Sequence, residues 1–119
     1  MGDKRGIAIS LNNIGTVYNN MNRLDTALSY FKRSIIIREE IGDKRGLAHN
    51  FRSLGGVYQR MGKLKLAKEY AIKSLKLSSE IGFSERIKDS ANLLSQIYQK
   101  EGDWKQAFEM KELYFLNER

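Results

Sequence analysis

The chain has 119 residues, of which 41% are hydrophobic and 29% charged, as is typical of one folded domain rather than a disordered segment. It has no cysteine, which excludes disulfides, thiolate metal sites and cysteine nucleophiles, and no proline, which favours helices. No apolar run approaches the roughly 20 residues of a membrane span. We therefore expect no membrane insertion; the location is unknown, with the cytoplasm favoured.

The net charge of +7 is concentrated in the middle of the chain. Residues 42–81 hold nine Lys and Arg against three Asp and Glu, a net charge of +6. The flanking segments, residues 2–41 and 82–119, carry +2 and −1. This distribution favours an acidic partner at the middle of the molecule.

The first forty residues predict two helices. In the first, over residues 4–21, the apolar residues fall four and three positions apart, as on one face of a helix: Ile7, Leu11, Ile14, Tyr18 and Met21. Asn22-Arg23 interrupts this pattern, and a second apolar stripe predicts a helix over residues 24–41. Gly42 is suited to end that helix and Asp43 to cap the next one.

The same pattern recurs forty residues later. Gly-Asp-Lys-Arg-Gly occurs at residues 2–6 and again at 42–46, and the offset also pairs Tyr18 with Tyr58. We predict three repeats, at residues 2–41, 42–81 and 82–119, the third more diverged than the others. The remaining helices are predicted at residues 44–61, 64–81, 84–101 and 104–118.

Two glycines lie inside predicted helices at the same place in the repeat, Gly15 and Gly55. Each costs about 1 kcal/mol relative to alanine, so we expect the second helix of the hairpin to approach closely there. Gly56 has no counterpart in the first repeat and no explanation from the pattern. Aromatic side chains are expected in the cores of the hairpins, namely Phe31, Trp104 and the tyrosines at positions 18, 58 and 98.

These residues resemble the tetratricopeptide repeat (TPR) signature of Leu or Ile, Gly, two residues and Tyr, with Ala nine residues later. The first two copies are Ile14-Gly15-Thr16-Val17-Tyr18 with Ala27 and Leu54-Gly55-Gly56-Val57-Tyr58 with Ala67. In the third copy, which has Tyr98 and Ala107, Ser95 replaces the glycine. The period is 40 rather than about 34 residues, and the proline that usually ends the second helix is missing. Long-period versions resemble the arrays of kinesin light chains, cell-polarity adaptors and bacterial sensory and signalling proteins. The junction at residues 40–46 and the ending at residues 114–118 look most like the bacterial group.

The resemblance covers essentially the whole chain. It implies an all-α fold, a right-handed superhelical solenoid of three antiparallel helix hairpins in a single array over residues 1–119. It also implies a protein–protein interaction module, a scaffold that binds a peptide or helix in its concave groove. The setting would be a regulatory or signalling protein.

In TPR arrays the first helix of each hairpin lines the concave side. Carried onto this sequence, the resemblance implies a peptide-binding set of Asn12, Asn13, Thr16, Asn19, His49, Arg52, Ser53, Gln59, Arg60, Asn92, Gln96 and Gln99. Amide and guanidinium groups can hydrogen-bond a peptide backbone and its carboxylates. The lysine-and-asparagine clamp of chaperone-binding TPRs is not reproduced, because Asn12 and Thr16 stand at its first two positions.

Two alternatives to peptide binding remain open. The first is a nucleic-acid-binding regulator fragment that uses the lysines of the second repeat, Lys63, Lys65, Lys68, Lys73 and Lys76. These lysines lack interleaved aromatics that could stack on bases, so a solvated convex face is the favoured interpretation. The second alternative is a structural self-assembly unit. His49 is the only histidine and no catalytic motif is present, so we expect no enzyme, no metal and no cofactor.

The two ends of the array lack the polar helices that usually cap such repeats. The first repeat begins in register at Gly2, and the last predicted helix still carries Leu113, Tyr114, Phe115 and Leu116. We therefore expect either a fragment of a longer repeat protein or a homo-oligomer formed through exposed array ends.

Overall fold

The computed structural model describes residues 3–118, which fold into six helices and, within that range, no strands. The helices are α1 (Lys4–Asn20), α2 (Leu24–Ile41), α3 (Lys44–Arg60), α4 (Leu64–Ile81), α5 (Ser84–Glu101) and α6 (Trp104–Leu116). Each begins at its predicted residue and ends within two residues of its predicted end. Over residues 3–118, no helix is both long and apolar enough to cross a membrane.

Short polar caps and left-handed residues fix the helix ends. The Asp43 carboxylate accepts a hydrogen bond from the Gly46 amide at 3.0 Å, which confirms its predicted role as the cap of α3. Gly42, at the end of α2, has a φ of 69°, a conformation that glycine adopts without strain. Asn22 takes the same conformation, with a φ of 64°, at the turn between α1 and α2. Asparagine is one of the few side chains that tolerate it.

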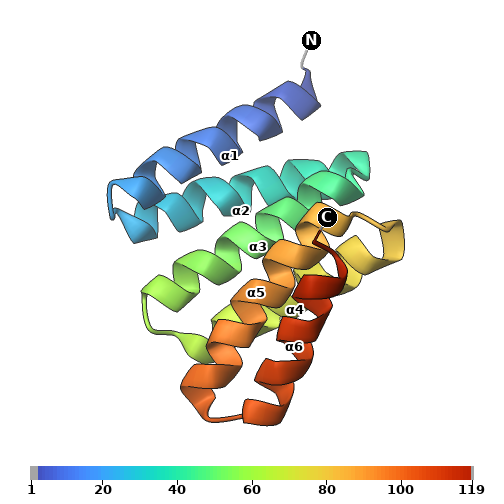
Figure 1. Ribbon diagram of the computed structural model, residues 1–119. Helices are drawn as coiled ribbons and strands as arrows, with labels where there is room; N and C mark the ends of the chain where they lie inside the picture. Colours follow the sequence, from blue (N-terminus) through green and yellow to red (C-terminus); the bar gives the residue numbers. More distant parts are fainter. Residues whose placement is uncertain (1–2, 119) are drawn as a thin grey trace.

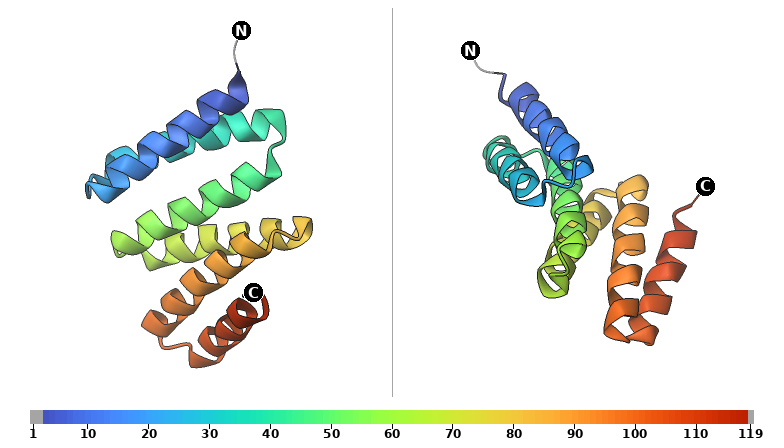
Figure 2. Two further views of the ribbon diagram at one scale, coloured as in Figure 1. Left: turned by 45° about the horizontal axis from the view of Figure 1, so that its top comes forward. Right: turned by 90° about the vertical axis from the view of Figure 1, so that its left-hand side faces the viewer.

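The helices pair into antiparallel hairpins, α1 with α2, α3 with α4 and α5 with α6, and successive hairpins stack through α2 on α3 and α4 on α5 (Figure 1). The stack extends over 49 × 30 × 21 Å. Its first and last helices, α1 and α6, lie at opposite ends (Figure 2). This stacking of offset hairpins is a superhelical solenoid.

The repeated glycines mark close contact within the hairpins. A Cβ atom at Gly55 would lie 3.2 Å from the Ala67 carbonyl oxygen of α4, and one at Gly15 would lie 2.8 Å from the Phe31 ring of α2. The predicted close approach of the second helix is therefore confirmed. In the third hairpin, Ser95 fits at this place and donates a hydrogen bond to the Ala107 carbonyl at 3.3 Å.

A buried serine repeats at another fixed place in the hairpins. The Ser34 hydroxyl donates to the Ala8 carbonyl at 2.8 Å, and forty residues later the Ser74 hydroxyl donates to the Ala48 carbonyl at 2.7 Å. Both serines are fully buried. Each bond satisfies a buried hydroxyl and holds the two helices of its hairpin in the same register.

The apolar core lies between and within the hairpins, and its almost fully buried large side chains are Phe31, Leu54, Val57, Leu93, Leu94 and Ile97. Tyr58 is buried there, with Tyr18 and Tyr98 packed at its border. The prediction for Trp104 is wrong, because its side chain is 67% exposed. Its counterparts Leu24 and Leu64 are partly covered, whereas Trp104 lies on α6, the last helix of the stack.

The apolar stripe of α1 is also only partly buried. Leu11 is buried and Tyr18 half-buried, but Ile7, Ile14 and Met21 are exposed. The physical reason is position, because α1 is the first helix of the stack and packs mainly against α2.

A buried polar cluster joins the first hairpin to the second. Arg38 of α2 is only 5% exposed. Its guanidinium donates to the Gly46 carbonyl at 3.0 Å and to the Asn50 side-chain oxygen at 2.6 Å. Its Nε lies 3.6 Å from the Asp43 carboxylate. These contacts tie the end of α2 to the start of α3, and they offset part of the cost of burying a guanidinium.

Candidate functional site

A polar groove of about 320 Å³ lies on the side of the stack where the first helices of the three hairpins face the same way. Its lining comes from α1, α2, α3 and α5 and consists of Thr16, Asn19, Phe31, His49, Arg52, Ser53, Gly56, Arg86 and Asp89. We call these residues the polar groove. Five of them, Thr16, Asn19, His49, Arg52 and Ser53, belong to the set predicted from the sequence.

Gly56 explains how Arg52 reaches the groove. Both residues lie on α3 one turn apart, and a Cβ atom at Gly56 would lie 2.8 Å from the Arg52 Nη1 atom. The missing side chain therefore leaves the space in which the Arg52 guanidinium rests. Among residues 3–118, no carboxylate forms an ion pair with Arg52. Asp89, which also lines the groove, opposes with its negative charge the lowering of the Arg52 pKa by burial, but it lies beyond ion-pair distance.

Arg86 is the groove residue that the sequence analysis missed. It lies in the first turn of α5 and pairs with Asp89 one turn later, with Nη1 and Oδ2 2.7 Å apart. A signal was present, because Arg86 occupies the place in the repeat where the first two copies have Gly6 and Gly46. A charged residue at a position that is otherwise glycine marks a local departure from the repeat.

The electrostatic environment keeps His49 neutral. The pKa of its imidazole falls to about 4, mainly because of burial and secondly because of the nearby positive charges of Arg86, Arg38 and Arg52, against the opposing effect of Asp89. Burial also lowers the pKa of Arg52, but a guanidinium remains charged at any physiological pH. The groove thus offers one unpaired positive charge, one guanidinium–carboxylate pair and a neutral imidazole.

The rest of the predicted set lies outside the polar groove. The Gln59 amide donates to the Gln96 side-chain oxygen at 2.9 Å, which links α3 to α5. Arg60 donates to the Asn19 carbonyl at 2.6 Å and to the Asn22 side chain at 2.9 Å, which links α3 to the end of α1. These residues bridge neighbouring hairpins along the same side of the stack.

Four further members of the predicted set differ in exposure. Asn13 and Gln99 are exposed and Asn92 is partly buried. Asn12 was predicted to line the groove, but its side chain is buried and its Oδ1 atom has no hydrogen-bond partner within residues 3–118. Its counterpart forty residues later, Arg52, does line the groove.

The lysines of the second repeat are partly engaged within the fold. Lys68 pairs with Glu101 of α5 at 2.9 Å, and the Lys73 ammonium lies 5.2 Å from the centre of the Tyr70 ring. Lys63, Lys65 and Lys76 are exposed. The set therefore does not form one uncommitted basic surface.

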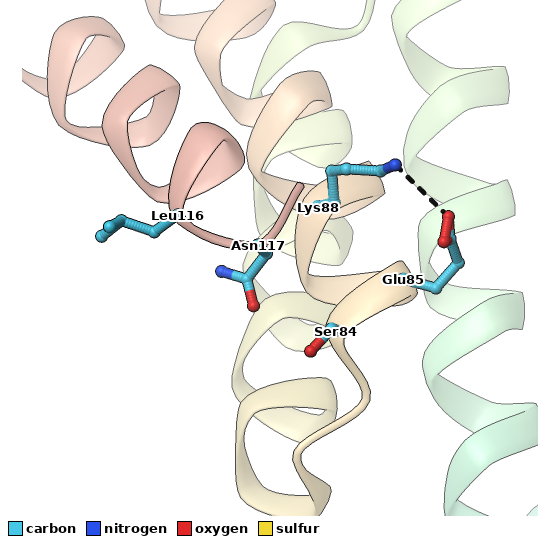
Figure 3. A pocket seen from close by; sticks show the side chains of 5 residues that line it. All are labelled: Ser84, Glu85, Lys88, Leu116 and Asn117. Atoms are coloured by element: carbon cyan, nitrogen blue, oxygen red, sulfur yellow. Dashed lines mark ion pairs between the residues drawn. The ribbon is translucent and has the colours of Figure 1, made fainter. Parts of the chain in front are cut away.

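A second hollow, of about 550 Å³, lies where the start of α5 faces the end of α6 (Figure 3). Lys88 and Glu85 point towards each other and form an ion pair of 3.4 Å, whereas Leu116 points away (Figure 3). Because these side chains diverge, this hollow offers no set of groups aimed at one ligand. The polar groove is the better candidate site.

The repeats of this chain match a known protein family. The tetratricopeptide repeat profile matches residues 6–78 and 47–114, which together span most of the chain. The chain belongs to the tetratricopeptide repeat family. TPR domains are in general protein–protein interaction modules, and the family is a scaffold family that typically lacks enzymatic activity. No curated protein sequence matches the chain.

Solved structures show the same TPR fold. The array is similar to the TPR domain of Arabidopsis FLU, with a TM-score of 0.88 and 22% identity over 95% of each chain. It is also similar to BtubC (BKLC) from P. vanneervenii, with a TM-score of 0.88 and 18% identity. That similarity covers 98% of this chain and 48% of that one. It is also similar to the N-terminal domain of stress-induced protein-1 (STI-1) from C. elegans, with a TM-score of 0.82 and 13% identity over 98% of this chain and 88% of that one. At these identities the likeness extends to the fold alone.

Proposed function

We propose that this TPR array binds an acidic segment of another protein in the polar groove. The observation that carries the proposal is the Arg52 guanidinium, which lies in the groove with no carboxylate partner among residues 3–118. Asp89 of the same groove attracts this guanidinium but makes its ion pair with Arg86 instead. A partly buried guanidinium that makes no ion pair favours a ligand carboxylate, because a charge-assisted hydrogen bond is stronger where water is partly excluded.

The other groove residues suit the backbone of such a segment. Asn19 and Ser53 can donate and accept hydrogen bonds, and neutral His49 can do both through its two ring nitrogens. The His49 Nδ1 atom is buried without a partner within the described part of the chain. Donors and acceptors from α1, α3 and α5 thus lie along one surface, as recognition of an extended peptide or a helix requires.

The exposed polar residues beyond the groove extend this proposed surface. Asn13, Asn92, Gln96 and Gln99 would contact the flanking parts of a bound segment, with Gln59 and Arg60 bridging the hairpins beside them. Asn12 would take no direct part, because its side chain is buried. A regulatory or signalling protein of the bacterial long-period kind remains the proposed setting.

The test of the groove is the charge-neutral variant Arg52→Gln. Wild-type protein is used to select binders from a displayed library of random linear peptides, and the affinity of the selected peptides is measured by fluorescence anisotropy. We expect the selected peptides to be enriched in Asp and Glu. We expect Arg52→Gln to bind them about tenfold or more weakly, because a hydrogen bond to a charged group contributes about 1.5–3 kcal/mol.

The matched control is Lys76→Gln, which removes the same charge from an exposed position on α4. It should bind the selected peptides as the wild type does. Equal binding by both variants would show that the groove is not the site, and equal weakening would show that only net charge matters.

A second candidate function is self-assembly through the ends of the array. One observation favours it, namely that the exposed large apolar side chains gather on the first and last helices of the stack, with Val17 on α1 and Phe108 on α6 among them. We propose that this function is independent of the groove, because neither of these residues lines it.

A further inference from the structure

The last helix of the stack exposes apolar side chains at places that the first hairpin buries. Phe108 of α6 is 64% exposed, whereas its counterpart Leu28 of α2 is 8% exposed. Phe115 is likewise exposed, whereas its counterpart Ile35 is buried. On α2 these places belong to the core that α3 completes. The face of α6 is therefore equivalent to a surface that a following hairpin covers.

The first helix of the stack shows the reverse relation. Val17 of α1 is 55% exposed, whereas its counterparts Val57 of α3 and Ile97 of α5 are 0% exposed. Ile14 is exposed, whereas Leu54 and Leu94 at the same place are almost fully buried. The face of α1 thus has the residue types with which α3 and α5 pack into the stack.

The last hairpin has an open hollow at one place in the repeat. At the equivalent place in the second hairpin, a side chain of the following helix α5 is packed. In the second hairpin, Leu93 of α5 seats against Gly55, with its Cδ2 atom 3.0 Å from the place of a Cβ atom there. The counterpart of Gly55 is Ser95. Ser95 borders an open, mainly apolar hollow of about 290 Å³ lined by Ser95, Gln99, Trp104, Ala107, Phe108 and Lys111.

We propose that copies of this chain associate head to tail, with α6 of one copy packed against α1 of the next as α2 packs on α3 and α4 on α5. The inference rests on the self-assembly function proposed above and specifies which surfaces meet. A second copy is the occupant that the residues favour, because Ile14 and Val17 on the open face of α1 match the apolar residues at the same places in α3 and α5, which already pack into the stack.

Contacts within the chain indicate which residues would meet between copies. The Lys68–Glu101 ion pair joins α4 to α5 at 2.9 Å. One repeat further along, the equivalent places hold Phe108 and Met21 of the second copy. Both residues are apolar, so an apolar contact replaces the ion pair there. The hydrogen-bonded pair Ser74 and Ser90, 2.7 Å apart, becomes Tyr114 against Ser10 of the second copy. The hollow beside Ser95 would receive Asn13 of the second copy, with Ser95 and Gln99 within the same hollow as hydrogen-bonding partners. Asn13 and Gln99 would then be covered at each junction, whereas the polar groove includes neither residue.

Head-to-tail pairing uses different surfaces on the two copies, so it leaves one free end on each side and does not close on itself. This predicts growth beyond a dimer as the concentration rises. It also predicts that blocking either end prevents association of that variant with itself.

The experiment combines Val17→Glu on α1 with Phe108→Glu on α6, each at an exposed position, and measures mass by sedimentation velocity. Wild-type mass should rise with concentration, whereas each variant alone should stay at the 13.7 kDa of one chain. An equimolar mixture of the two variants should form 1:1 dimers and nothing larger, since each supplies the intact end that the other lacks. Measurement at about 0.15 M salt screens the repulsion between basic chains.

The control is Ile36→Glu, which changes another exposed apolar residue. The equivalent place in the second repeat holds the charged residue Lys76, so a charge is compatible with the fold there. This variant should associate as the wild type does. Circular dichroism establishes that each variant is folded. Self-association of Val17→Glu or Phe108→Glu alone would overturn the head-to-tail geometry but keep self-assembly, because like ends would then be pairing. A wild-type monomer at millimolar concentration would overturn both.

Discussion

His49 shows how a single residue in the groove depends on its neighbours. The ring is partly buried among Arg38, Arg52 and Arg86, with Asp89 as the nearby acid, and its pKa falls from an ordinary value of 6.5 to about 4. A positively charged imidazole would add a fourth positive charge to this group. The neutral ring is thus the form that the folded state favours.

This pKa predicts how the stability of the fold depends on pH. Between pH 6.5 and pH 4 the unfolded chain binds a proton at His49 that the folded chain does not bind. The stability associated with the neutral ring is therefore complete above pH 6.5 and is lost as the pH falls towards 4. We expect a loss of about 2 kcal/mol, less than the whole shift implies because the ring is partly solvated.

Urea unfolding of the wild type and of His49→Gln between pH 7 and pH 4 measures this loss. The variant should lack the part of the pH dependence that belongs to His49, so the difference between the two curves isolates it. Parallel curves would contradict the assignment, and the imidazole NMR shifts of the wild type would then titrate near 6.5 instead of near 4.

Arg38 is the residue on which the junction between the first two hairpins depends. Its guanidinium is the partner of the Asn50 side chain, the Gly46 carbonyl and the Asp43 carboxylate. We expect Arg38→Ala to lower the free energy of unfolding by about 3 kcal/mol, because it leaves buried acceptors unpaired and opens a cavity. Lys32→Ala, at an exposed position of the same helix, is the control and should change stability by less than about 0.5 kcal/mol in chemical denaturation.

At the scale of the element, α3 contains two adjacent glycines whose surroundings differ. A Cβ atom at Gly55 would meet Leu93 at 3.0 Å and the backbone of α4 at 3.2 and 3.3 Å. A Cβ atom at Gly56 would meet only the Arg52 Nη1 atom, at 2.8 Å, which is the mobile end of a long side chain. The first glycine serves packing between helices, and the second leaves room for a groove residue.

These surroundings predict opposite effects for two neighbouring substitutions. Gly55→Ala should destabilise the protein by about 1–2 kcal/mol, because α4 cannot move away without loss of core contacts. Gly56→Ala should stabilise it by about 0.5–1 kcal/mol, since alanine is the better helix former and Arg52 can rotate aside. Thermal unfolding of both variants provides the measurement, and the same sign of change for both would contradict this account of α3.

At the scale of the whole molecule, stacking divides the surface of the TPR array into two kinds of region. The side formed by α1, α3 and α5 carries the polar groove, to which three hairpins contribute side chains. The two ends carry the apolar faces of α1 and α6. A repeat protein can therefore combine a lateral groove with end-to-end association, because the polar groove and the apolar end faces are formed by different residues.

The sequence by itself determined the elements. The forty-residue period, the glycines at 42, 62, 82 and 102 and the capping aspartates predict six helices to within two residues, because caps and left-handed residues are local features. The resemblance to TPR arrays, rather than the period alone, predicted Thr16, Asn19, His49, Arg52 and Ser53 on one side of the stack. These five residues line the polar groove.

Only the tertiary structure decided which equivalent residues are covered and which are free. Trp104 and Ile14 are exposed although their counterparts are covered, since a helix at the end of a stack lacks the neighbour that covers the others. Arg86 enters the groove through the angles at which the hairpins meet, and Asn12 is buried although its counterpart in the second repeat lines the groove. Those angles depend on side-chain contacts between hairpins, such as those of Arg38, and a periodic pattern contains no information about them.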